Sequence, residues 1–73
     1  MNQLESPMEI AQRDVAKAER RVAYQAAHVA QLKSEGSDTT QAEAILDSHK
    51  ALLRFLREDL EYLKTKAGLS YLQ

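Results

Sequence analysis

The feature that most limits the possible folds of this chain is a short turn sequence, Gly36-Ser37-Asp38-Thr39-Thr40, near the middle of its 73 residues. Glycine readily closes a helix in the left-handed conformation, and Asp and Thr side chains cap the first amides of a helix. The segment therefore predicts the end of one helix and the beginning of another. Because a connection this short holds two helices side by side, we expect an antiparallel pair.

The first helix is predicted to span residues 7–35. Ser6 can cap its free amides, Pro7 suits the first helical position, and Glu9 can complete a capping box. Farther on, hydrophobic residues recur at alternating spacings of three and four, which is typical of the buried stripe of a coiled coil. The stripe comprises Met8, Ala11, Val15, Ala18, Val22, Gln25, Val29 and Leu32, and it is interrupted by the polar Gln25.

The second helix is predicted to span residues 39–67. Two capping boxes compete for its start, Asp38 with Gln41 and Thr40 with Glu43, and both stay open. Gly68 is the expected C-cap. One face, about 120° wide, collects the hydrophobic side chains. It holds Ala42, Ile45, Leu46, His49, Leu52, Leu53, Leu56, Leu60 and Leu63. The fold class is all-α, with one domain over 1–73 and frayed ends at 1–5 and 69–73.

Folding at the turn should bring together residues whose numbers sum to about 74. Gln25 then lies opposite His49, so each hydrophobic stripe has its polar residue in the same layer. This pair is predicted to form a buried polar layer that fixes register and oligomeric state. Two alternatives stay open for His49: a place at the edge of the core with its polar tip in water, and a pH switch. His28 is expected to be solvated.

A two-helix pair of this size seldom has enough core to be stable alone. The simplest completion is a homodimer that forms a four-helix bundle. The expected interface combines an alanine stripe on the first helix with large side chains on the second: Ala16, Ala23, Ala27, Ala30, Leu46, Leu53, Phe55 and Tyr62. The alanines have a simpler alternative explanation, since alanine is the best helix former. Binding of a different protein to a monomeric hairpin is a further alternative.

Basic residues cluster on the first helix at Arg13, Lys17, Arg20 and Arg21, close to Tyr24. They could contact RNA phosphates, which gives an alternative function. A net charge of −1 disfavours nucleic acid as the main partner. The absence of cysteine excludes thiol chemistry and cysteine-ligated metals. We expect no enzyme activity, cofactor, metal, small-molecule substrate or membrane span, and a cytoplasmic location.

The region around the turn, Gly36-Ser37-Asp38-Thr39-Thr40-Gln41-Ala42-Glu43, resembles a group of small uncharacterised bacterial proteins. Those proteins have a long helix, a Gly-x-Asp-Thr-Thr-x-Ala-type turn and a leucine-rich second helix, and the resemblance extends over roughly residues 22–62. It implies the same helical hairpin and no particular activity. The expected function is therefore a non-enzymatic protein–protein interaction module that acts as a scaffold, adaptor or small regulator.

Overall fold

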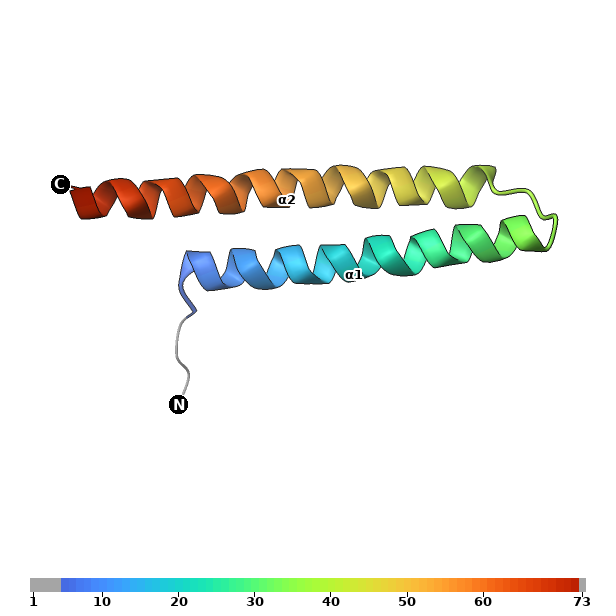
Figure 1. The fold of residues 1–73 in the computed structure, drawn as a ribbon, viewed down its shortest axis with the longest axis horizontal. Coiled ribbons are helices and arrows are strands. Elements are labelled where there is room, and N and C mark those ends of the chain that lie inside the picture. The colour runs from blue at the N-terminus through green and yellow to red at the C-terminus, as the bar shows by residue number, and fades with distance from the viewer. Residues whose placement is uncertain (1–4, 73) are drawn as a thin grey trace.

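The computed structural model describes residues 5–72, which form two long helices lying side by side and antiparallel (Figure 1). Helix α1 spans Pro7–Ser34 and has 28 residues. Helix α2 spans Thr40–Leu72 and has 33 residues. The described part of the chain is thus an all-α hairpin, as predicted. Because α2 is longer, its last turns extend past the start of α1 (Figure 1).

The start of α1 is fixed by the predicted capping box. The amide of Glu9 donates to the Ser6 hydroxyl at 3.1 Å, and the amide of Ser6 donates to Glu9 Oε1 at 2.9 Å. Two amides that lie outside the helical hydrogen-bond ladder are satisfied in this way. Pro7 occupies the first turn, where its missing N–H costs nothing.

The end of α1 is a Schellman motif centred on Gly36, which has φ +72°. The Ser37 amide donates to the Leu32 carbonyl at 2.9 Å, and the Gly36 amide donates to the Lys33 carbonyl at 3.1 Å. These bonds satisfy carbonyls that the last helical turn leaves free. The prediction that Gly36 closes the first helix is confirmed, and the helix ends at Ser34, one residue before the predicted limit.

The two glycines offer a matched pair of substitutions. Gly36→Ala should lower the free energy of unfolding by about 1–2 kcal/mol, because a Cβ in the left-handed region meets its own backbone. Gly68 lies inside α2, so Gly68→Ala should raise that free energy by up to about 1 kcal/mol. At neither position would a Cβ meet an atom beyond the neighbouring backbone within 4 Å, so both effects come from the backbone. Urea unfolding followed by circular dichroism measures both, and effects of the same sign would contradict this explanation.

The start of α2 uses the turn residues differently from either predicted capping box. The Asp38 carboxylate accepts hydrogen bonds from the Thr40 amide at 3.0 Å and the Thr40 hydroxyl at 2.7 Å. The Thr39 carbonyl accepts the Glu43 amide at 2.8 Å, and the Thr39 hydroxyl donates to the Glu43 carboxylate. Thr40 is therefore the first residue of α2. The Thr39 hydroxyl binds a carboxylate and satisfies no amide of the helix. The side chain that binds the first amide of α2 is the carboxylate of Asp38, two residues before Thr40.

The stability of this turn should depend on pH through Asp38. Hydrogen bonds from the Thr40 amide and hydroxyl to the Asp38 carboxylate hold the pKa of Asp38 below its usual value. A group whose pKa is lower in the folded state contributes stability above its unfolded pKa, and this is lost as pH falls through the folded pKa. The thermal midpoint should thus fall on acidification below about pH 4. Asn at this position keeps an acceptor oxygen but does not titrate. The thermal midpoint of the Asp38→Asn variant should therefore fall less over the same pH range, as measured by circular dichroism.

The C-terminus of α2 differs from the prediction. Gly68 does not end the helix, which continues to Leu72. Within residues 5–72 the only positive φ of a glycine belongs to Gly36. A helical glycine costs about 1 kcal/mol relative to alanine, which is too little to stop a helix when no proline or competing cap follows. The predicted frayed segment 69–73 is therefore helical through Leu72, while residues 1–4 and 73 lie outside the described residues.

The core between the helices is thin. Six hydrophobic residues of the described part are buried, and three of them are alanines. They are Ala11, Val15, Ala18, Val29, Ala42 and Leu53. Val15, Ala18 and Leu53 form a cluster against which Val22, Leu56 and Leu60 pack. No side chain described is completely buried, because two helices can cover only one stripe of each other.

Candidate interaction surface

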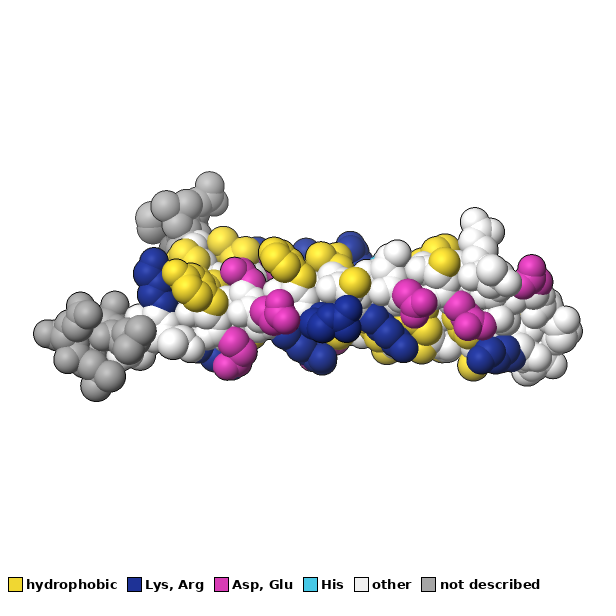
Figure 2. All heavy atoms as spheres, turned by 90° about the horizontal axis from the view of Figure 1, so that it is seen from above, with side chains coloured by type: hydrophobic (Ala, Val, Ile, Leu, Met, Phe, Trp, Pro, Cys, Tyr) yellow, Lys and Arg dark blue, Asp and Glu magenta, His cyan; other side chains and the backbone are white. Residues whose placement is uncertain are grey.

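Helix α2 carries a row of large hydrophobic side chains that α1 covers only in part. Phe55 is 63% exposed and Tyr62 is 61% exposed, while Ile45 and Leu52 are 42% and 43% exposed. Figure 2 looks onto the outer side of α2, where hydrophobic side chains gather along one edge beside a row of charged ones. Four of the six large hydrophobic side chains that are exposed among the described residues therefore belong to α2.

The hydrophobic pattern predicted that Ile45 and Leu52 face the first helix. The structure confirms this only in part, because both side chains stay partly exposed. The hydrophobic face of α2 spans roughly 120°, and a single neighbouring helix covers a narrower stripe. Leu53 and Ala42, at the centre of that face, are buried. Ile45 and Leu52 lie at its edge and keep a little over 40% of their surface exposed. The hairpin alone thus satisfies only part of the pattern in its own sequence.

The other predicted interface residues are divided between the two sides. Ala23, Ala27 and Ala30 of α1 are exposed, whereas Ala16 and Leu46 are half-buried. Leu53 is a correction to the prediction: it is only 7% exposed and belongs to the intrachain core, so it offers little surface to a partner. The sequence does not show which of Leu52 and Leu53 is buried against the first helix, because both adjacent residues lie within the hydrophobic face.

The predicted polar layer also takes a different form. Gln25 and His49 are both half-buried, and no polar side chain among the described residues is buried. The side-chain amide of Gln25 donates to the Ala42 carbonyl at 3.0 Å, which is a backbone acceptor near the start of α2. His49 therefore fits the alternative of a residue at the edge of the core. His28 is exposed, as expected.

The basic residues of α1 are only partly brought together. Arg13 pairs with Glu5 at 2.5 Å and does not line the hollow that the other three share. Lys17, Arg20 and Arg21 line one shallow hollow. The same hollow is bordered by Tyr24, Gln25 and His49. The arrangement concentrates positive charge beside one aromatic ring, which is a weak feature of single-stranded nucleic-acid sites.

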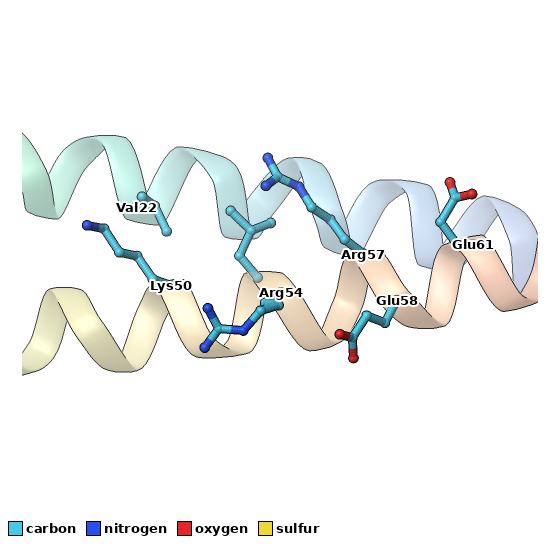
Figure 3. Close-up of a pocket in the computed structure, with 7 residues that line it drawn as sticks. Val22, Lys50, Arg54, Arg57, Glu58 and Glu61 are labelled. Atoms are coloured by element: carbon cyan, nitrogen blue, oxygen red, sulfur yellow. The ribbon is translucent and has the colours of Figure 1, made fainter.

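The opposite groove between the helices is lined by charges of both signs. Lys50, Arg54, Arg57, Glu58 and Glu61 extend from α2 around Val22 and Leu53 (Figure 3). Arg57 reaches Glu19 of α1 at 3.0 Å, and Lys64 reaches Glu61 at 3.4 Å. All four side chains of these ion pairs are at least 49% exposed, so each pair contributes little to stability. This side of the hairpin is best explained as a solvated face.

Comparison with known protein families, curated proteins and solved structures yields no match. The resemblance of the turn to small bacterial hairpin proteins therefore stays a prediction. Over the described residues, neither helix has a segment that is both long and apolar enough to cross a bilayer. Those residues also contain no group of three or more His, Asp or Glu side chains placed to hold a metal ion. The feature that distinguishes the surface is the partly exposed hydrophobic row of α2.

Proposed function

We propose that this protein is a non-enzymatic protein–protein interaction module that pairs with itself through α2, forming a four-helix bundle from two hairpins. The observation that carries the proposal is the exposure of Ile45, Leu52, Phe55 and Tyr62 on one helix. Such a dimer would serve as a scaffold, adaptor or small regulator. The lack of cysteine suits a reducing compartment such as the cytoplasm.

The thin intrachain core supports a self-pairing partner. Chains of about this length bury only about 60% of the surface that the unfolded chain exposes, and they are often stabilised by disulfides, metals or oligomerisation. Disulfides are excluded because the chain has no cysteine. Homodimers with two-fold symmetry are the commonest assemblies of soluble proteins. A second hairpin placed against α2 would cover the residues that α1 leaves exposed.

The test is whether unfolding depends on protein concentration. For a dimer that unfolds to separate chains, mass action raises the thermal midpoint as concentration rises. We expect the midpoint to increase by several degrees between about 1 and 100 µM chain, because this range adds roughly 2.7 kcal/mol of association free energy. A midpoint that is independent of concentration would contradict the dimer. Circular dichroism in two path lengths gives both measurements.

The alternative function is RNA binding through α1, supported by the hollow that gathers Lys17, Arg20 and Arg21. Phosphate contacts weaken steeply as salt rises. A gel shift with a structured RNA at two salt concentrations, using the triple substitution of these residues by Gln, tests it. Salt-sensitive binding that the triple variant loses would favour this alternative, and absence of a shift at low salt would eliminate it.

A further inference from the structure

The exposed hydrophobic residues of α2 follow a second heptad pattern beside the one that faces α1. Ile45, Leu52 and Asp59 are seven residues apart, and Ser48, Phe55 and Tyr62 are also seven apart, offset from the first set by three. All six residues are exposed. Alternating spacings of three and four are those of the a and d positions of a coiled coil. α2 thus carries one heptad stripe that packs on α1 and a second that α1 covers only in part. Ile45 and Leu52 border hollows between the helices, whereas Phe55 and Tyr62 are more than 60% exposed.

This second stripe is symmetric about the peptide bond between Leu53 and Arg54. Ile45 and Tyr62 lie at equal distances from that point, as do Leu52 and Phe55. When two copies of one helix pack antiparallel about a two-fold axis, residues at equal distances from the axis meet. An axis at this point brings Ile45 of one copy to Tyr62 of the second copy, and Leu52 of one copy to Phe55 of the second copy. Each aliphatic side chain then meets an aromatic one, on both sides of the axis.

The polar members of the stripe favour the antiparallel direction over the parallel one. Ser48 and Asp59 also lie at equal distances from the axis, so an antiparallel pair places the uncharged Ser48 opposite the Asp59 carboxylate. The Ser48 hydroxyl donates to the Ala44 carbonyl at 3.2 Å in the hairpin, and it would have to turn away from that carbonyl to donate to Asp59. A parallel pair would instead place Asp59 opposite Asp59 of the second copy. Two like charges facing each other at a contact are repulsive. The charge pattern therefore selects the direction of pairing.

We infer that two copies of this chain associate by antiparallel packing of α2 against α2, with the two turns at opposite ends of the bundle and Leu52 and Phe55 beside the axis. This inference rests on the proposed function and specifies its contact surface. Covering both copies of Phe55 and Tyr62, which are more than half exposed, removes on the order of 500 Å² from water. That is a large share of the 1,200–2,000 Å² that stable interfaces bury. The half-buried Leu56 and Leu63 flank the stripe on the α1 side and add to the contact.

Site-directed disulfide formation tests this geometry, because the natural chain has no cysteine. Two variants, Ser48→Cys and Asp59→Cys, are purified separately, mixed in equal amounts and equilibrated in a glutathione redox buffer. The inference expects covalent dimers that contain one chain of each variant. Neither variant alone should cross-link, since like cysteines would stand roughly 16 Å apart along the axis, at 1.5 Å per residue. A disulfide needs Cα atoms within about 7 Å.

The matched control is the pair Lys50→Cys and Arg57→Cys. These residues are also exposed and lie at equal distances from the same point, but they line the groove on the opposite side of α2. They should not cross-link when mixed. Mass spectrometry identifies the covalent species, and sedimentation of the reduced variants gives their oligomeric state.

The outcomes separate this inference from the proposed function. Mixed dimers of the first pair, with none from the control pair, support it. Homodimers of Ser48→Cys or of Asp59→Cys would show parallel packing and overturn it. Reduced variants that sediment as dimers without forming mixed disulfides would overturn the geometry but leave the proposed function standing. If the reduced variants and the unmodified chain all sediment as monomers, both this inference and the proposed function are overturned.

Discussion

For the proposed dimer, we expect replacement of both Phe55 and Tyr62 by serine to give a monomer whose helical hairpin is intact. Both side chains are more than 60% exposed, so α1 loses few contacts when they are shortened. In the dimer each ring would be covered by the second copy, and buried aromatic residues contribute about 2 kcal/mol or more to an interface. The dissociation constant should therefore rise at least a hundredfold. Sedimentation equilibrium measures this change, and circular dichroism checks that the helices persist.

Tyr24→Ser is the control for this double substitution. Tyr24 is also an exposed aromatic residue, at 79%, but it belongs to α1 and lies outside the second stripe of α2. Its replacement should leave the mass of the protein unchanged. If the Phe55/Tyr62 variant kept the mass and dissociation constant of the unmodified protein, the hydrophobic row of α2 would not be the contact surface.

Leu53→Ala should produce the largest loss of stability among single substitutions in the core. Leu53 is 7% exposed and is the largest buried residue of the cluster that joins the helices. Removing a buried leucine side chain costs about 2–5 kcal/mol. We expect a value in the lower half of this range, about 2–3 kcal/mol, because the open sides of the hairpin allow neighbours to move into the space. Urea unfolding at a fixed protein concentration measures the loss.

Leu53→Met provides the comparison for this position. Methionine has a similar volume and adapts to irregular spaces, so its cost should stay below about 1.5 kcal/mol. A cost of Leu53→Ala no larger than that of Leu53→Met would mean that the Val15–Ala18–Leu53 cluster does not hold the helices together.

Most of the fold could be predicted because its limits are set by local chemistry. Ser6, Glu9 and Gly36 act within four residues of their own positions, and the structure uses each of them as the sequence indicates. The end of α2 could not be predicted in the same way. Gly68 is compatible with a cap, but a cap also needs the following chain to leave the helix, and here the helix continues.

The surface was harder to predict than the fold because it depends on how far one helix covers another. The hydrophobic pattern of α2 is wide enough for two neighbours, and the structure provides one. Leu53 is consequently buried while Leu52 is exposed, a difference that periodicity alone does not resolve. The hydrogen bond of Gln25 could not be predicted from periodicity either. The register predicts a polar layer with His49, whereas the side-chain amide of Gln25 donates to the Ala42 carbonyl.

The most direct test of the proposed self-association is sedimentation equilibrium of the unmodified protein at micromolar concentration. A dimer will give twice the chain mass of 8.2 kDa, with the helix content of a folded hairpin. A folded species of 8.2 kDa at the same concentration would contradict self-association through α2.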